Sequence, residues 1–505
     1  MYLLGIDLGS SSVKAALVET DTGRVAATGQ YPPTEMAIDA PQPGWAEQDP
    51  AAWWEATQRA VKSALAHADV RSDAVQAIGI GYQMHGLVCL DANQNALRPS
   101  IIWCDSRAIT IGEDALAALG ASYCLPHLLN SPGNFTASKL RWVQQHEPEV
   151  FAKTDRICLP GDYLAAKLTG EVATTVSGLS EGMFWDFAEG RPSQALLDHY
   201  GIPESMLADR VPTFGDQGKL TTEAAAALGF AAGTPVTYRA GDQPNNALSL
   251  NVLNTGEVAA TAGTSGVVYG VSDQVKYDPQ SRINSFAHVN HPPEADSNQR
   301  EARIGLLLCI NGTGIANAWA KRLVGGEHDY AVLNELAARA PIGSDGLCVL
   351  PFGNGGERML GNAEVGGHLG FADFNRHGPA HIARAVQEGI AFSFGYGMSI
   401  LRDTGVDLGV IRAGRANLFL SPLFRQTLAN VADTRIELYD TDGAVGAARG
   451  AGLGAGVYAS PEEAFASLEQ IDATEPDPAA RDAMQAAYQR WADYLDAVLC
   501  NVAKA

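Results

Sequence analysis

The chain opens with two mostly apolar runs on either side of a short polar turn. The runs cover residues 2–8 and 13–18, and residues 9–12 between them read Gly-Ser-Ser-Ser. Apolar runs of strand length around a glycine-serine turn predict a β-hairpin. The same arrangement returns at residues 257–271, where residues 263–266 read Gly-Thr-Ser-Gly. Two such units far apart in one chain suggest a duplicated α/β domain with a cleft between the copies.

Strand and helix patterns alternate through the first half of the chain. A helical pattern covers about residues 53–66, with Asp49 placed as its N-cap and Pro50 in its first turn. Residues 77–82 form another strand-like run, and residues 138–145 form another helical one. Alternation of this kind indicates an α/β fold.

The C-terminal half carries two further helical patterns. Gly446, Gly450 and Gly454 recur at helical spacing among alanines, which predicts a helix packed closely against its neighbours. Between the second hairpin and these helices, residues 290–303 are polar and predict a surface insertion. A final helix is predicted to start near residue 477 and to dock on the core. Its apolar stripe consists of Met484, Tyr488, Trp491, Leu495 and Val498.

Length and charge limit the class of protein. The chain has 505 residues, of which 46% are apolar, so we expect two to four domains with a large core. It carries 35 Lys and Arg against 57 Asp and Glu, a formal net charge of −22 at pH 7. A surface of this sign repels phosphate backbones and anionic lipids, so neither nucleic acid nor a membrane is expected as a partner. No uninterrupted apolar stretch reaches the roughly 18 residues of a membrane span.

The cysteines indicate a reducing compartment. There are seven, they are scattered, and no Cys-x-x-Cys pair occurs. This pattern argues against a disulfide framework and against a structural zinc site. The N-terminal residues also lack the basic and apolar segments of a secretion signal. We therefore expect a cytoplasmic protein.

Asp7 and the first hairpin turn form the first candidate for chemistry. Glycine lets a backbone approach phosphate oxygens, and the successive amides and hydroxyls of residues 9–12 can bind an anion. A carboxylate beside such a turn can hold Mg²⁺ through water. An ordinary hairpin with a polar turn fits the same residues equally well. The pattern GxxxxGK[ST] is absent, which excludes a P-loop nucleotidase.

Asp242 is the second candidate. It follows a strand-like run and Gly241, so it can act as a general base at the end of a strand. The pair Gly-Asp is also common in turns, and the local sequence alone favours the turn. Its position favours function, because it stands at the expected boundary between the halves, just before the second glycine-rich turn.

The third candidate is a sugar site. A sugar is bound by hydrogen-bonding groups around an apolar wall. Residues 83–86 read Gln-Met-His-Gly and residues 103–107 read Trp-Cys-Asp-Ser-Arg, which supply both kinds of group. A single histidine such as His85 is more often structural than a ligand, so both roles stay open. Trp45 fits either a stacking surface or a core anchor.

Glycine-rich segments in the second half form the fourth candidate. They lie at residues 312–314, 353–358 and 414–417, and none is a G-x-G-x-x-G that follows a strand, so a dinucleotide-binding fold is not supported. Each segment also fits a plain loop. Ser421 and Pro422 predict a helix start just after the last of them.

Taken together, these motifs resemble the FGGY family of carbohydrate kinases, and within it the members that phosphorylate xylulose. The resemblance spans nearly the whole chain; each motif is weak by itself, but their order is specific. The matching segments are residues 5–11, 44–54, 83–86, 103–107, 241–243, 262–266, 356–358 and 442–448.

The resemblance implies both a fold and a reaction. The fold is α/β, with two actin-like ATPase (ribonuclease H-like) domains flanking a central cleft. We expect residues 1–245 to form the domain on the sugar side. Residues 246–505 would form the ATP side and carry the C-terminal docking helix. The reaction is transfer of phosphate from ATP, with Mg²⁺, to the terminal hydroxyl of D-xylulose, which gives D-xylulose 5-phosphate. The alternatives are another ketose, polyol or sugar acid as acceptor, or an actin-like ATP-binding scaffold without transfer activity.

The resemblance also assigns roles to residues. Asp242 matches the catalytic aspartate, and Asp7 and Asp242 are expected near Mg²⁺. The substrate-binding residues are expected to be Gln83, Met84, His85, Trp103, Asp105, Asp242 and Gln243. The residues expected to bind ATP are Ser10, Ser11, Ser12, Gly263, Thr264, Ser265, Gly314, Gly414 and Asn417.

Cys104 stands where several relatives have Asn or Gln, and the chain departs from the family pattern at two further places. The loop at residues 412–420 is longer than usual and lacks the Gly-Gly-Gly-Ala run of many relatives, and residues 244–246 read Pro-Asn-Asn instead of small residues. The second of these two leaves the local helix start open. The expected partners are a small-molecule sugar and ATP, with a homodimer left open.

Overall fold

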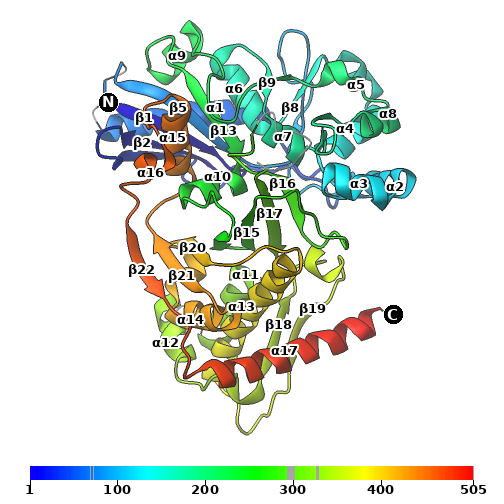
Figure 1. The fold of residues 1–505 in the computed structure, drawn as a ribbon, viewed down its shortest axis with the longest axis vertical. Coiled ribbons are helices and arrows are strands. Elements are labelled where there is room, and N and C mark those ends of the chain that lie inside the picture. Colours follow the sequence, from blue (N-terminus) through cyan, green and yellow to red (C-terminus); the bar gives the residue numbers. More distant parts are fainter. Residues whose placement is uncertain (69, 72, 293–301, 326–328, 504–505) are drawn as a thin grey trace.

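The computed structural model describes residues 1–505 except 69, 72, 293–301, 326–328 and 504–505. Figure 1 shows two halves stacked along the long axis of the molecule, each built on its own sheet. Most of the expected surface insertion at residues 290–303 lies outside the described residues. Among the described residues, no helix combines the length and apolar character that crossing a membrane requires.

The first sheet has five strands in the order β13-β5-β1-β2-β3. β1 and β2 form the expected antiparallel hairpin, β3 continues it, and β5 and β13 add parallel strands on the other side. The predicted strand at 77–82 is β5. The bounds are β1 (Tyr2–Leu8), β2 (Val13–Glu19), β3 (Val25–Tyr31), β5 (Val75–Tyr82) and β13 (Val236–Gly241).

The second sheet repeats this plan with two more strands. Its order is β16-β17-β15-β14-β20-β21-β22. The antiparallel hairpin β14-β15 is the one predicted at 257–271, and β20 and β21 run parallel beside β14. The bounds are β14 (Glu257–Ala262), β15 (Gly266–Ser272), β16 (Asn284–Ala287), β17 (Ile304–Ile310), β20 (Val410–Gly414), β21 (Arg435–Tyr439) and β22 (Gln470–Thr474).

The predicted helices are present with slightly different ends. α1 (Pro50–Ala68) and α4 (Thr136–His146) extend the runs expected at 53–66 and 138–145, and the Asp49 carboxylate accepts the Ala51 amide at 2.9 Å. α17 (Arg481–Val502) begins four residues later than expected. Its apolar stripe faces the second core, where Trp491 donates a hydrogen bond to the Val349 carbonyl at 2.8 Å.

The remaining elements complete the two halves. The other helices are α2 (Ile109–Leu119), α3 (Ala121–Leu128), α5 (Pro148–Lys153), α6 (Pro160–Thr169), α7 (Val176–Glu181), α8 (Gln194–Tyr200), α9 (Thr222–Leu228), α10 (Asp242–Ser249), α11 (Gly314–Gly325), α12 (Tyr330–Ala337), α13 (Pro379–Asp403), α14 (Pro422–Ala432), α15 (Gly443–Gly454) and α16 (Pro461–Ala464). The shorter strands are β4 (Glu47–Gln48), β6 (Val88–Leu90), β7 (Ser100–Ile101), β8 (Arg156–Cys158), β9 (Ala173–Thr174), β10 (Trp185–Asp186), β11 (Arg191–Pro192), β12 (Asp209–Arg210), β18 (Cys348–Phe352) and β19 (Gly366–Gly370).

α15 carries the glycines with helical spacing and packs on the first sheet, although it lies in the second half of the sequence (Figure 1). A Cβ on Gly450 would lie 2.6 Å from the Tyr238 ring, and a Cβ on Gly5 of β1 would overlap the Ala444 carbonyl. The predicted close packing is therefore confirmed. The domain division between residues 245 and 246 stays a prediction. α15 follows this division in the sequence but packs on the first sheet.

Candidate active site

Asp242 is the first residue of α10 and directly follows β13. Figure 1 shows α10 near the junction of the two halves. Pro244 lies in the first turn of α10, where its missing N–H costs nothing, so this departure from the family pattern leaves the helix start in place. Burial and, second, the charge of Asp7 raise the pKa of Asp242 to about 7, against the opposing effect of hydrogen bonds from Gln243. Asp242 is thus a carboxylate that can take up a proton near neutral pH.

Asp7 lies one residue before the end of β1 and faces the start of α15. A Cβ on Gly443 would lie 2.5 Å from Asp7 Oδ2, so only glycine fits beside this carboxylate. Burial and, second, the charge of Asp442 raise the pKa of Asp7 to about 6, against the opposing effect of Lys14. Asp7, Asp242 and Asp442 therefore form a region of negative charge at the junction of the halves.

This region suits a divalent cation held partly by a substrate. Among the residues that the structure describes, no three His, Cys, Asp or Glu side chains are placed to bind a metal ion together. Mg²⁺ is commonly bound by one or two carboxylates with phosphate oxygens and water as its other ligands. The raised pKa values of Asp7 and Asp242 fit that arrangement, because a cation would relieve the repulsion between them.

The first hairpin turn is held from several sides. Gly9 N–H donates to the Ser12 carbonyl at 3.1 Å, which closes the turn. Ser10 accepts two hydrogen bonds, at Oγ from Trp103 Nε1 at 3.3 Å and at its carbonyl from Gln48 Nε2 at 2.7 Å. Ser11 is exposed, and the other two serines are half-buried.

Gln48 also joins this turn to the predicted sugar loop. Its Oε1 accepts a hydrogen bond from Gln83 Nε2 at 3.1 Å and another from Trp53 Nε1 at 3.0 Å. Gln48 was not among the residues predicted to be functional. Its place in the segment at residues 44–54 was the available signal.

His85 is held in an unusual conformation by residues from two helices. Its φ is +60°, in the left-handed region that a non-glycine residue rarely adopts. Its backbone N–H donates to Glu181 Oε2 at 3.2 Å, and its carbonyl accepts from Lys139 Nζ at 2.9 Å. Burial lowers the pKa of His85 to about 3, aided by the nearby Lys139 charge, so the ring is neutral at pH 7. Neither Glu181 nor Lys139 was predicted, because each lies in a helix remote in sequence from the loop.

The other residues expected at the sugar differ in exposure. Gln83 and Met84 are buried, Gln243 is half-buried, and Trp103 is 52% exposed. Asp105 is buried, where its carboxylate accepts the Ala46 amide at 2.6 Å and pairs with Arg107 at 2.7 Å. Asp105 therefore stabilises its loop from inside rather than presenting a carboxylate to the cleft.

Trp45 acts as a core anchor for that loop. The Arg107 guanidinium lies 3.8 Å from the centre of one Trp45 ring and 4.7 Å from that of Trp142. Trp45 and Trp142 also meet edge to face with 5.1 Å between ring centres. Of the two roles left open for Trp45, the structure shows the structural one.

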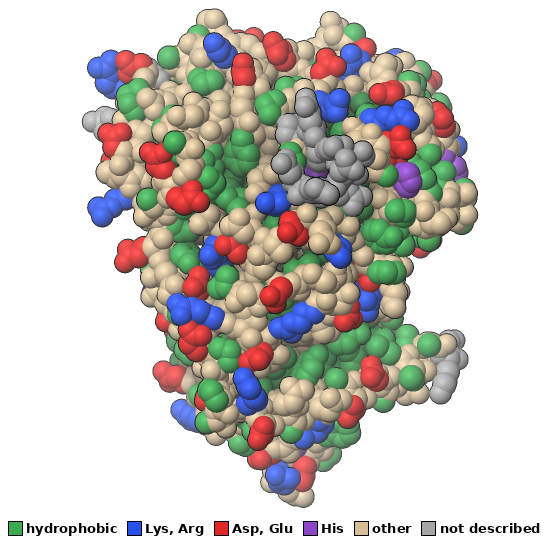
Figure 2. Space-filling view, in the orientation of Figure 1, with side chains coloured by type: hydrophobic (Ala, Val, Ile, Leu, Met, Phe, Trp, Pro, Cys, Tyr) green, Lys and Arg blue, Asp and Glu red, His purple; other side chains and the backbone are tan. Residues whose placement is uncertain are grey.

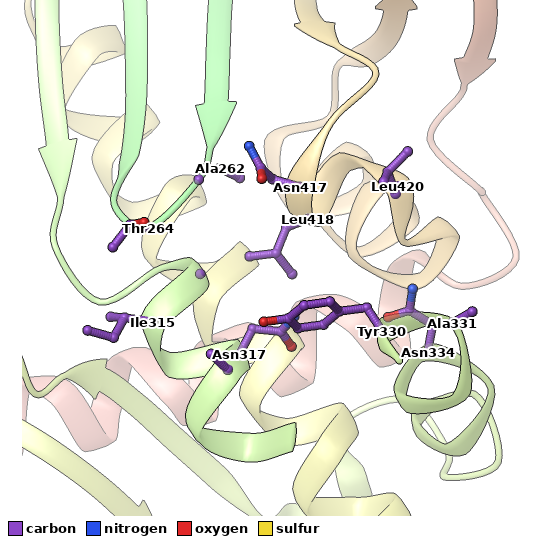
Figure 3. A pocket seen from close by; sticks show the side chains of 13 residues that line it. Ala262, Thr264, Ile315, Asn317, Tyr330, Ala331, Asn334, Asn417, Leu418 and Leu420 are labelled. Atoms are coloured by element: carbon purple, nitrogen blue, oxygen red, sulfur yellow. The ribbon is translucent and has the colours of Figure 1, made fainter. Parts of the chain in front are cut away.

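A pocket of about 570 Å³ lies in the second half, between the turn of the β14-β15 hairpin and helices α11 and α12 (Figure 3). Gly314 N–H donates to the Gly263 carbonyl at 2.8 Å, and a Cβ on Gly314 would overlap that oxygen. Figure 3 shows Leu418 pointing toward the Tyr330 ring across the pocket. The lining residues are Ala262, Gly263, Thr264, Gly314, Ile315, Asn317, Ala318, Tyr330, Ala331, Asn334, Asn417, Leu418 and Leu420.

This pocket has the properties of a nucleoside site. No lining residue carries a formal charge, and apolar side chains alternate with amides. Asn317 Oδ1 is buried and has no hydrogen-bond partner among the described residues, so it is available to a ligand. Four residues expected at ATP line the pocket, whereas Ser265 and Gly414, also expected there, do not. The four are Gly263, Thr264, Gly314 and Asn417.

Comparison with known proteins identifies similar chains. Residues 2–249 match the model of the N-terminal domain of the FGGY family of carbohydrate kinases. The xylulose kinase of Escherichia coli strain K12 is 33% identical over 471 residues, 93% of this chain and 92% of that protein. The L-xylulose/3-keto-L-gulonate kinase of the same organism is 30% identical over 509 residues, 98% of this chain and 97% of that one.

A solved structure is similar over the full length. The xylulose kinase from Rhodospirillum rubrum superposes with a TM-score of 0.87 and 27% sequence identity, and the match covers 99% of this chain and 100% of that one. The two-sheet arrangement is therefore shared with a sugar kinase from end to end.

Proposed function

Since the chain belongs to the FGGY family of carbohydrate kinases and is a phosphotransferase that acts on an alcohol group, we propose that its acceptor is D-xylulose and its product D-xylulose 5-phosphate. The family implies ATP as the phosphate donor. The fold is the actin-like ATPase fold of that family. The scaffold alternative without transfer activity is thereby set aside.

One contact carries the proposal for the acceptor side. A Cβ on Gly241, the residue before Asp242, would lie 2.6 Å from Met84 Cγ. The loop expected to bind the sugar therefore abuts the strand end that carries the expected general base. A sugar held by residues 83–85 would present a hydroxyl close to Asp242.

The chemistry follows from this placement. A phosphoryl group is transferred through a loose transition state, so positioning and charge neutralisation contribute most of the rate. Asp242 would orient the acceptor hydroxyl and take its proton as the new P–O bond forms, while the bond from the γ-phosphorus to the bridging oxygen breaks. Amides of the two hairpin turns would bind phosphate oxygens, with Ser10 and Thr264 adding hydroxyls.

Asp7 and Asp242 are the residues that would hold Mg²⁺. The ion would neutralise charge on the phosphates of ATP. The described carboxylates cannot surround it alone, so we propose that phosphate oxygens and water supply its other ligands.

A sugar panel tests the substrate. ADP release would be followed with ATP, Mg²⁺ and, in turn, D-xylulose, L-xylulose, a hexulose, a polyol and a sugar acid. D-xylulose should give the highest kcat/KM, by about tenfold or more. A higher kcat/KM with L-xylulose or a keto acid would indicate the substrates named for the L-xylulose/3-keto-L-gulonate kinase. A higher kcat/KM with a hexulose, a polyol or another sugar acid would also overturn the xylulose proposal.

The remaining expectations are also proposals. The free cysteines among the described residues support a cytoplasmic location. A group of exposed apolar side chains, Leu369, Phe371 and Phe374, supports the homodimer, since water-exposed apolar groups of this size often mark a contact surface. Light scattering at micromolar concentration would decide between one chain and two.

A further inference from the structure

Glu181, at the C-terminal end of α7, joins the sugar loop to the strand end that carries Asp242. Its side chain is 2% exposed. Its Oε2 accepts the His85 N–H at 3.2 Å and lies 3.4 Å from where a Cβ on Gly241 would stand. We propose that Glu181 is a positioning residue for the acceptor sugar, which fixes the His85 loop against the catalytic strand end. This inference rests on the proposed function.

The first argument is backbone strain. A non-glycine residue in the left-handed region is strained and persists only where its surroundings hold it. His85 has φ +60°, and its N–H and C=O are bound by Glu181 Oε2 and Lys139 Nζ. Loss of the Glu181 carboxyl would leave a buried N–H unpaired and release the loop on that side.

The second argument is the protonation of the His85 ring. Nδ1 lies 3.0 Å from the Glu181 backbone carbonyl, which can only accept, so Nδ1 carries the proton. The ring is neutral, so Nε2 has a free lone pair, and no described residue hydrogen-bonds to it. Phe135 and Phe286 fix the ring plane, with ring centres 4.8 and 5.3 Å away. Glu181 thus sets which atom of His85 can accept a sugar hydroxyl.

The third argument is the state of the Glu181 carboxyl itself. Burial raises its pKa well above the ordinary range, and the neighbouring Asp242 raises it further against the effect of Tyr82. Its Oε1 is buried without a hydrogen-bond partner among the described residues. The raised pKa favours the uncharged form, which reduces repulsion of Asp242, while Oε2 accepts the His85 N–H.

Three substitutions test this role. Glu181→Gln keeps the length of the side chain and an oxygen that can accept a hydrogen bond, and it is uncharged. Glu181→Asp shortens the side chain, and Glu181→Ala removes it. Glu388 provides the matched control, because it is also 2% exposed and accepts a backbone amide, from Gly343 at 3.0 Å, in the second half. The variants would be assayed with ATP and the sugar that the panel shows to be preferred.

The expected result is a selective change in the KM for the sugar. Glu181→Asp and Glu181→Ala should raise it about tenfold or more, with the KM for ATP within about twofold, and Glu181→Gln should restore it. Glu388→Ala should lower Tm without changing either KM. In a His85→Ala background, Glu181→Asp should add little, because both changes act through one loop.

Three outcomes would overturn the proposal: an unchanged sugar KM in Glu181→Asp, equal increases for sugar and ATP, or full additivity with His85→Ala. If Glu181→Ala does not fold, the contrast between Asp and Gln decides. The wild-type panel tests the proposed function separately. A preference for another sugar would reject xylulose and still leave the Glu181 comparison measurable.

Discussion

Each of the two sheets contains five equivalent strands in the same order and with the same directions. The residues at the ends of these strands differ in chemical type. Asp7 and Thr261 occupy the same place in β1 and β14, each one residue before the last pair of the hairpin. α10 and α15 follow the equivalent strands β13 and β21, and begin beside Asp242 and Asp442. In the first half these positions supply carboxylates with raised pKa values. In the second half, Ala262 next to Thr261 lines an uncharged pocket, whereas Asp442 lies near Asp7.

The difference shows how one backbone plan supports two tasks. Acceptor activation needs a base with a pKa near neutrality, which burial of two neighbouring carboxylates provides. Binding a nucleoside needs a mostly apolar, uncharged lining with a few hydrogen-bonding groups, which the pocket of the second half provides. Asp442 and Asp242 are the same type of residue in different roles. The Asp442 side chain accepts the Val445 amide at 3.0 Å and so acts as a helix N-cap.

Figure 2 adds the view from outside. Acidic and basic side chains are dispersed over this face of both halves, so the separation of tasks lies in the interior rather than in two oppositely charged surfaces. The contrast between the halves is therefore best tested at buried positions.

The largest effect is expected from Asp242→Asn. The amide cannot accept the hydroxyl proton, so kcat should fall by about a thousandfold or more while ATP binding, measured by calorimetry, is retained. Asp442→Asn is the matched comparison at the start of α15, where Asp442 caps the helix and its charge raises the pKa of Asp7. Since it keeps an N-cap side chain, it should change stability by about 1 kcal/mol or less and kcat by much less. Similar losses in both variants would abolish the distinction between the halves.

The next largest effect concerns packing of α15 on the first sheet. Gly5→Ala would force a methyl group into the Ala444 carbonyl, and we expect a loss of about 3 kcal/mol in the free energy of unfolding. Urea denaturation would measure it. Gly378→Ala, in open space before α13, should cause little change. Equal midpoints for the two variants would contradict the close approach.

A smaller and more selective effect is expected from Gly314→Ala. The added methyl would separate α11 from the Gly263 carbonyl and distort the uncharged pocket. The KM for ATP should rise about tenfold, with the KM for the sugar unchanged. Gly353→Ala, whose Cβ would have no neighbour closer than 3.5 Å, serves as control. A rise in the sugar KM instead would place the nucleotide elsewhere.

The smallest effect is a pH dependence that distinguishes the two sheets. The pKa of Asp242 is about 7 in this structure, and the base must be unprotonated, so kcat/KM for the sugar should fall up to tenfold for each pH unit below about 7. Asp7→Asn removes a negative charge that raises this pKa. In that variant, the fall in the remaining kcat/KM should therefore occur at lower pH than in the wild type. Thr261→Val, at the same place in the second sheet, should not shift it. If activity falls over the same pH range in the wild type and in both variants, the electrostatic coupling between Asp7 and Asp242 would be contradicted.

Much of the fold was predictable because the patterns are local. The β1-β2 and β14-β15 hairpins, α1 and α4 follow from apolar periodicity and turn residues, which act within a few positions. The glycine spacing of α15 also predicted close packing correctly. The sheet on which α15 packs could not be predicted, because the spacing of residues within a helix does not show which other element the helix contacts.

The site divides in the same way. The sequence by itself determined which segments carry reactive groups: an aspartate after a strand, a polar loop at residues 83–86, and two glycine-rich turns. The tertiary structure alone decided that Glu181 and Lys139 hold His85, that Asp105 faces inward, and that Gln48 joins two loops. Burial and long-range contacts, which no local pattern encodes, set those pairings, and they also raise the pKa of Asp242 toward neutrality.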